Sequence, residues 1–139
     1  MKQLNVYLAF EKGQCRAALS FYEKALDGEI VSLQTFGESP VPANEATKDH
    51  VMHAEFKAGD IAFMASDGSS EYQYQAGNNV TLSINLDSTD EQTKIFDALA
   101  EGGTVTMPLQ DTFWGARFGM LIDKYGINWM TNCNTEKKD

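Results

Sequence analysis

Hydrophobic and polar residues follow two kinds of periodicity in the first half of the chain. From Leu4 to Phe10 they alternate, which is typical of a strand with one buried face. From Gln14 to Leu26 apolar residues recur every three or four positions, which predicts an amphipathic helix that ends at Asp27-Gly28. Three more strands are predicted at Glu29 to Phe36, His50 to Phe56 and Ile61 to Ser66. This half therefore reads strand, helix and three strands.

The second half repeats this order. Val80 to Leu86 alternates, and Ser88-Thr89-Asp90-Glu91 is a capping box for a helix that runs to Glu101. Three strands follow, at Thr104 to Leu109, Arg117 to Asp123 and Ile127 to Cys133. The first helix end, 21–30, aligns with 96–105, an offset of 75 positions. We interpret this as an internal duplication, with modules at 4–66 and 79–133, a connection at 67–78 and a tail at 134–139.

The duplication predicts one α+β domain built from two βαβββ modules. One helix covers only one face of its own sheet, so each module keeps an uncovered face. We expect the two uncovered faces to meet, with either a packed core or a ligand cavity between the modules.

Composition and charge narrow the function classes. The chain is 42% hydrophobic and 22% charged, as in ordinary soluble domains, and its net charge of −9 disfavours nucleic acid and anionic membranes as partners. No apolar run approaches the roughly 18 residues of a membrane span, and the N-terminus lacks a signal-peptide pattern, which predicts a cytoplasmic protein. Cys15 and Cys133 lack metal or redox spacing, so we expect reduced core cysteines.

Several motifs resemble one family: Tyr7-Leu8-Ala9-Phe10, Val51-Met52-His53-Ala54, Phe63-Met64-Ala65-Ser66-Asp67, Thr112-Phe113-Trp114-Gly115, and Asp123-Lys124-Tyr125-Gly126 followed by Trp129-Met130. Over residues 4 to 133 the chain resembles the PhnB-like branch of the vicinal oxygen chelate superfamily, which includes glyoxalase I, bleomycin-resistance proteins and extradiol dioxygenases. The resemblance implies paired βαβββ modules and a homodimer. The name demethylubiquinone methyltransferase-like also attaches to this branch. The chain has no glycine-rich nucleotide-binding turn, however, so we expect neither methyl transfer nor a bound cofactor.

The resemblance also implies where a metal would bind. Enzymes of the superfamily hold a divalent cation with four His, Gln or Glu side chains from the first and last strands of each module. Carried over by strand, these places fall near Asn5, Met64, Thr81 and Met130. Thioether and neutral amide or hydroxyl groups are poor ligands for such cations, so we expect no metal.

Two side chains are weak catalytic candidates. His53, with Glu55 on the same strand face, either exchanges protons in the cavity or simply bonds to a neighbour. Asp67 either reaches the cavity mouth or caps a turn.

Aromatic residues are the better candidates for ligand binding. Tyr7, Phe63, Phe113, Trp114, Phe118 and Trp129, together with Met64, Met120 and Met130, either line an apolar pocket or fill the core. Trp114 is the least suited to a sheet core because a glycine follows it in a loop. Arg117 either holds a ligand carboxylate or phosphate or pairs with Asp111. Asn5 and Thr81 would orient the ligand by hydrogen bonds.

We therefore predict a metal-independent, homodimeric protein that binds a small molecule in an aromatic-lined cavity between the modules. Two alternatives stay open: a metal-dependent lyase, isomerase or dioxygenase with an unrecognised metal site, and a dimeric interaction module in which Trp114 lies at the interface.

Overall fold

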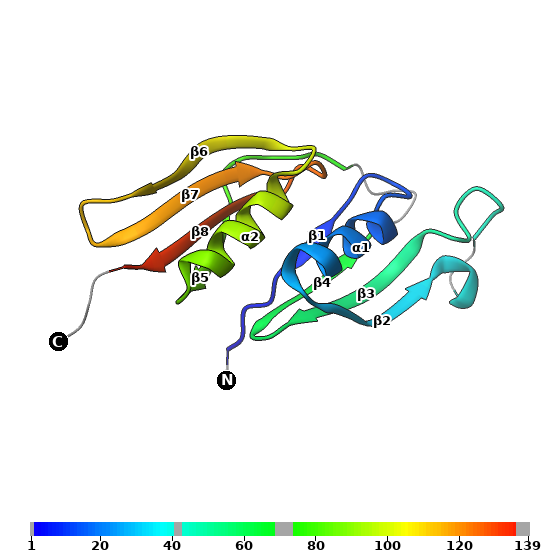
Figure 1. The fold of residues 1–139 in the computed structure, drawn as a ribbon. Helices are drawn as coiled ribbons and strands as arrows, with labels where there is room; N and C mark the ends of the chain where they lie inside the picture. Colours follow the sequence, from blue (N-terminus) through cyan, green and yellow to red (C-terminus); the bar gives the residue numbers. More distant parts are fainter. Residues whose placement is uncertain (1, 41–42, 69–73, 136–139) are drawn as a thin grey trace. The chain divides into compact units, whose positions relative to one another are not determined.

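The protein is described by a computed structural model that covers residues 2–40, 43–68 and 74–135. The chain forms two compact units, residues 1–75 and 76–139, and the described residues of each form one α-helix and one four-stranded sheet (Figure 1). The predicted α+β class with tandem βαβββ modules is confirmed. No helix in the described part of the chain is long and apolar enough to cross a membrane.

The first unit has the element order of its predicted module. Its elements are β1 (Tyr7–Ala9), α1 (Cys15–Leu26), β2 (Glu29–Thr35), the short 3-10 helix η1 (Phe36–Glu38), β3 (Val51–Ala58) and β4 (Ile61–Ser66). The sheet order is β1-β4-β3-β2, with β1 parallel to β4 and the other pairs antiparallel.

The second unit repeats this topology. Its elements are β5 (Leu82–Leu86), α2 (Thr89–Ala100), β6 (Thr104–Asp111), β7 (Ala116–Ile122) and β8 (Asn128–Asn134). The sheet order is β5-β8-β7-β6, again with only the first strand parallel to its neighbour. Ser88 caps α2 as predicted, since its hydroxyl accepts a hydrogen bond from the Glu91 amide at 3.2 Å.

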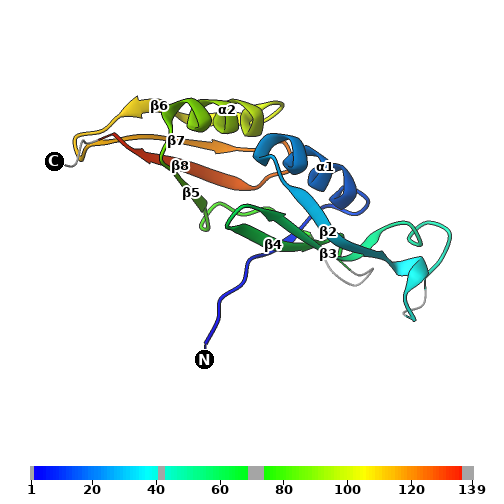
Figure 2. The same ribbon diagram turned by 60° about the horizontal axis from the view of Figure 1, so that its bottom comes forward.

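In the first unit the apolar stripe of α1 forms the core against one face of the sheet (Figure 2). The buried residues of α1 are the predicted ones: Cys15, Ala18, Leu19, Tyr22, Ala25 and Leu26. The Tyr22 ring lies edge-on to Phe56 and Phe63, with centroids 6.4 and 5.7 Å away, and these two rings stack at 4.7 Å. In the second unit α2 buries Ile95, Phe96 and Leu99, and the sheet buries Leu121, Trp129 and Cys133.

Each helix is followed by a glycine that has no room for a side chain. A Cβ on Gly28 would lie 2.6 Å from the Phe56 ring, and one on Gly103 would lie 2.2 Å from the Ile122 carbonyl oxygen. These glycines are 75 residues apart and occupy corresponding positions, which supports the duplication. The chain can pass from helix to sheet here only because the side chain is missing.

The first strand of each unit is shorter than predicted. β1 begins at Tyr7 instead of Leu4, and Leu4 is 95% exposed. β5 likewise begins at Leu82 instead of Val80. Both are edge strands with one neighbour. No second strand offers hydrogen bonds to their N-terminal ends, so alternating apolar residues there are not enough to extend the strand.

Candidate functional site

The first unit presents polar side chains on the sheet face opposite α1. Successive side chains of a strand point to opposite faces, so the burial of Ala54 and Phe56 beneath α1 places His53, Glu55 and Lys57 on the open face. The strand register sets Met64 of β4 beside both Glu55 and Tyr7.

Three of these side chains form a connected row. The Tyr7 hydroxyl lies 3.1 Å from His53 Nδ1, and His53 Nε2 lies 3.9 Å from a Glu55 carboxylate oxygen. When the Tyr7 hydroxyl donates to Nδ1, the proton of neutral His53 sits on Nε2 and faces Glu55. His53 therefore bonds to a neighbour, as one alternative predicted, and its role in proton exchange stays a prediction.

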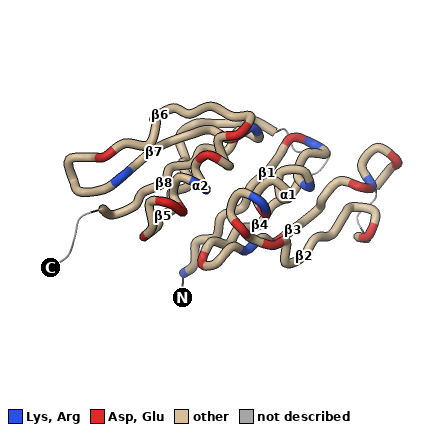
Figure 3. The backbone as a smooth tube through the Cα atoms, in the orientation of Figure 1, with Lys and Arg blue, Asp and Glu red and all other residues tan. Residues whose placement is uncertain are grey.

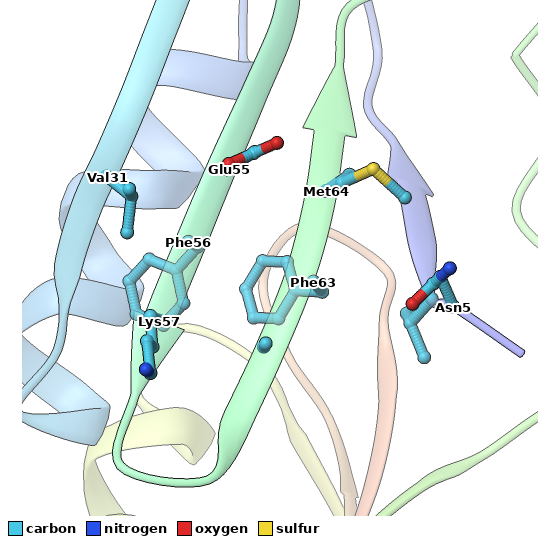
Figure 4. Close-up of a pocket in the computed structure, with 9 residues that line it drawn as sticks. Asn5, Val31, Glu55, Phe56, Lys57, Phe63 and Met64 are labelled. Atoms are coloured by element: carbon cyan, nitrogen blue, oxygen red, sulfur yellow. The ribbon is translucent and has the colours of Figure 1, made fainter. Parts of the chain in front are cut away.

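A pocket of about 310 Å³ lies beside this row (Figure 4). Its lining combines apolar groups from three strands with an amide, a carboxylate and an ammonium group. The lining residues are Asn5, Val6, Val31, Glu55, Phe56, Lys57, Ala62, Phe63 and Met64. Asn5, Phe63 and Met64 were predicted ligand residues, and the structure brings them together here.

The open face of the second sheet carries apolar side chains mixed with neutral polar ones. The register places Ser83 and Met120 on either side of Met130, and Phe118 is opposite Asn132. The loop between β6 and β7 extends this surface, because the Trp114 ring lies 6.1 Å from Phe118.

The aromatic tip of this loop is largely exposed. Phe113 and Trp114 are 98% and 53% exposed, and their rings meet edge-on at 5.1 Å. The structure thus brings Phe113, Trp114 and Phe118 together at the loop, and their role as ligand residues stays a prediction. The proposed cavity between the modules stays a prediction.

The Arg117 side chain is held by α2, and its predicted role in ligand binding stays a prediction. Its guanidinium group donates to α2: to the Thr89 carbonyl at 3.1 Å, the Gln92 side chain at 3.3 Å and the Thr93 hydroxyl at 2.8 Å. The sheet register sets Asp111 opposite Arg117, and directly opposed residues of an antiparallel pair point to the same face. The hydrogen bonds of the guanidinium group nevertheless go to α2, on the helix-covered face. Strand alternation decides this, since Phe118 occupies the open face next to it.

Asp67 is a buried structural residue, 2% exposed. Its carboxylate accepts hydrogen bonds from the Cys15 amide at 2.9 Å and from the Val51 amide at 2.7 Å. It therefore caps the start of α1 and fastens β3, which agrees with the capping alternative and not with a place at a cavity mouth. Burial, and then the Asp67 charge, raise the pKa of the Cys15 thiol to about 12, so this cysteine stays neutral.

The places that would hold a superfamily metal do not suit a divalent cation. The strand neighbours of Met64 and Met130 are Tyr7 and Ser83, while the predicted positions Asn5 and Thr81 lie two residues earlier. Thioether, phenol, amide and hydroxyl groups do not form the carboxylate or imidazole set that such ions prefer. The described residues also contain no group of three or more His, Cys, Asp or Glu side chains suited to a metal. We derive no chemistry through a metal.

Comparison with known proteins places this geometry in a family. The family model described as 3-demethylubiquinone-9 3-methyltransferase matches residues 2–131. The chain belongs to this family. It is thus a PhnB-like member of the vicinal oxygen chelate superfamily, as the motifs predicted.

Similar proteins support the assignment to the PhnB-like group. Protein PA1353 from Pseudomonas aeruginosa is 44% identical, with a TM-score of 0.87 over 98% of this chain and 100% of that one. A protein from Bacillus cereus described as a putative 3-demethylubiquinone-9 3-methyltransferase, PhnB protein, is 28% identical, with a TM-score of 0.79 over 95% and 99%. Protein YjdN of Escherichia coli is 30% identical over 93% of each chain. A glyoxylase/bleomycin resistance protein/dioxygenase domain from Frankia, 14% identical with a TM-score of 0.65 over 99% and 95%, shares the fold.

Lys57 lines the pocket and was missed by sequence analysis. The predicted strand ended at Phe56 and assigned Lys57 to the hairpin turn, whereas β3 continues to Ala58 and the turn is Gly59-Asp60. Alternation of His53, Glu55 and Lys57 was the available signal, because it places all three on one face.

Proposed function

We propose that the protein is a metal-independent small-molecule-binding member of the PhnB-like family, with its ligand in the pocket on the open face of the first sheet. The observation that carries this is the 310 Å³ pocket, in which apolar walls surround three polar side chains. Its size falls at the lower end of the range for small-molecule sites, and the mixture of many apolar and few polar groups is typical of them.

The side chains support binding without a metal. Met64 lies between the Tyr7 phenol and the Glu55 carboxylate, so the centre of this face offers a thioether where a metal enzyme needs a harder ligand. The superfamily fold and the donor chemistry together favour a binding protein. The family description names a methyltransferase, but neither unit has the doubly wound parallel sheet of dinucleotide-binding folds. A cytoplasmic location and a homodimer remain parts of the proposal.

Neutral aromatic probes test this function directly. We expect benzyl alcohol and indole to bind, by ligand-detected NMR, equally well with EDTA and with added Zn²⁺ or Ni²⁺. Ala62→Phe should abolish binding because it fills the pocket, whereas Thr106→Phe, on an exposed position of β6, should leave it unchanged. Binding that requires a metal, or that Ala62→Phe does not affect, would overturn the proposal.

A second candidate function rests on the exposed tip Phe113-Trp114. Large exposed aromatic side chains are frequent anchors of protein interfaces, which favours self-association through this loop. We expect Trp114→Ala to shift the protein towards monomer in analytical ultracentrifugation while pocket binding persists. An unchanged oligomeric state would exclude this role for Trp114.

A further inference from the structure

Two opposite charges enter the pocket from one strand. Glu55 and Lys57 both line it, and they are separated on β3 by the single residue Phe56, whose neighbour across the sheet is Phe63. Alternate residues of an antiparallel strand lie on the same face, about 6.8 Å apart. The pocket therefore has an acidic position and a basic position side by side.

Apolar groups lie beside these charges on the β4 side, while on β2 the register sets Ser32 opposite Glu55 and Glu29 opposite Lys57. The residues of β4 opposite Glu55 and Lys57 are Met64 and Ala62, and Val31 contributes from β2. Figure 4 shows the Met64 side chain extending towards the β1 side, where Asn5 lies. A ligand that reaches both charges thus also covers an apolar surface large enough for a hydrocarbon or aromatic group.

The charge pattern selects among ligand classes. A ligand whose only charge is an ammonium group pairs with Glu55, but it shields Lys57 from water without offering it an opposite charge. A ligand whose only charge is a carboxylate pairs with Lys57 and does the same to Glu55. Removing a charge from water without pairing it is costly. A zwitterion pairs both, and its zero net charge avoids repulsion from a chain of net charge −9, whose acidic residues are spread over both units (Figure 3).

We propose that the pocket binds an apolar zwitterion of the α-amino acid type, with the ligand ammonium group on Glu55 and its carboxylate on Lys57. The apolar side chain of the ligand would lie against Val31, Ala62 and Met64. The two charges of an amino acid are roughly 3 Å apart, and a charge-assisted hydrogen bond of about 2.8 Å extends from each. The flexible side chains of Glu55 and Lys57, whose strand positions are about 6.8 Å apart, would reach these two charges. This inference rests on the proposed function, because it names the ligand class of the same pocket.

Four probes that share a phenyl ring test the ligand class. L-phenylalanine carries both charges, phenethylamine only the cation, 3-phenylpropionate only the anion, and benzyl alcohol neither. At low ionic strength and pH 7.5 we expect L-phenylalanine to bind on the order of tenfold more tightly than each of the other three, because ion pairs with hydrogen bonds exceed neutral contacts. Equal affinities for all four would overturn the inference.

Charge variants identify the residues involved. Glu55→Gln and Lys57→Gln should each lower the affinity for L-phenylalanine about tenfold and leave that for benzyl alcohol unchanged. The matched changes Asp97→Asn and Lys94→Gln, at exposed positions of α2, should affect neither. The double reversal Glu55→Lys with Lys57→Glu should recover part of the lost affinity, since the ligand can then bind in the opposite orientation.

The two proposals fail in different ways. If benzyl alcohol binding is lost in Ala62→Phe while L-phenylalanine has no advantage, the pocket binds small molecules of another class and only the zwitterion inference is wrong. If none of the four probes binds in a way that Ala62→Phe abolishes, the proposed function is wrong as well. If L-phenylalanine binds tightly and Glu55→Gln has no effect, its ammonium group is held elsewhere and the inference is overturned.

Discussion

The open faces of the two sheets differ although their strands correspond residue by residue. Met64 and Met130 occupy equivalent positions, since each pairs with the first strand of its unit and with the third strand. Around them the first unit has His53, Glu55 and Lys57, and the second has Phe118, Met120 and Ile122 at the corresponding places. The first face carries charged side chains and a pocket, and the second carries apolar and neutral polar side chains.

The comparison separates what the fold requires from what it leaves open. On the helix-covered faces both units keep apolar packing, because any polar group there must find a partner inside a small core. On the open faces neither composition disturbs the helix packing, so the two copies could diverge. The charged pocket in the first unit is therefore evidence for function more than for folding.

The largest effects are expected where each unit depends on a buried aspartate. Asp67→Ala removes the carboxylate that accepts hydrogen bonds from the Cys15 and Val51 amides. Asp123→Ala removes the carboxylate that accepts from the Tyr125 and Ile127 amides and from the Trp129 indole N–H. We expect each change to lower the free energy of unfolding by about 3 kcal/mol in urea titrations.

An exposed aspartate provides the control. Asp97→Ala on α2 should change the free energy of unfolding by less than about 0.5 kcal/mol. If Asp67→Ala were as mild as this control and instead weakened probe binding, Asp67 would belong to the ligand site and not to the core.

Arg117→Met is the next largest change, and it tests which face Arg117 serves. The variant loses three hydrogen bonds to α2, so we expect a loss of about 1–2 kcal/mol in the free energy of unfolding and no change in probe binding. Arg16→Met, at an exposed position of α1, is the control. Weaker probe binding at unchanged stability would restore the predicted ligand role of Arg117.

The Cys15 thiol predicts a smaller, pH-dependent effect in the first unit. Its pKa is raised from 9.0 to about 12 in the folded protein, so above pH 9 the unfolded chain loses this proton first. Stability from this group is full below pH 9, is lowered by about 1 kcal/mol at pH 10 and continues to fall towards pH 12. In urea titrations between pH 8 and 10, the free energy of unfolding should fall more for the native protein than for Cys15→Ala. Cys133→Ala should show the same fall in the free energy of unfolding as the native protein. If the pH profiles of Cys15→Ala and Cys133→Ala were parallel, the effect would not come from the Cys15 thiol.

The two tryptophans give the smallest effect, on fluorescence alone. Trp114 is 53% exposed, whereas Trp129 is 2% exposed and donates to Asp123 at 2.8 Å. We expect acrylamide to quench mainly Trp114, and Trp114→Phe to remove most of the quenchable emission without altering the free energy of unfolding by more than about 0.5 kcal/mol. Strong residual quenching in Trp114→Phe would show that the described loop does not present Trp114 to solvent.

Prediction from sequence was most successful where burial imposes a period. The six buried residues of α1 were all identified, because a helix against a sheet must place apolar side chains every three or four positions. The ends of the first strands and the extent of β3 were less predictable. An edge strand has one partner, and a lysine can continue a strand on its exposed face as readily as it can begin a turn.

The candidate site was only partly visible in the sequence. Asn5 and Met64 were selected by their strand positions, Phe63 as an aromatic residue, and His53 with Glu55 by their shared face, so five of the relevant residues were named beforehand. Val31 and Lys57 were missed because each joins the pocket only through the sheet register. The hydrogen bonds of Arg117 to α2 were also missed, because the sequence does not show which face of the sheet α2 covers.

The sequence by itself determined the duplicated βαβββ order and the buried stripe of each helix, because these follow from local periodicity. The weak metal-ligand set followed from the family resemblance together with residue chemistry. Only the tertiary structure decided that Asp67 and Arg117 face the helices, and that Glu55 and Lys57 share a pocket with Asn5. These relations join residues that lie up to 52 positions apart in the case of Asp67 and Cys15. Strand pairing establishes such proximity, and no local pattern in the chain encodes it.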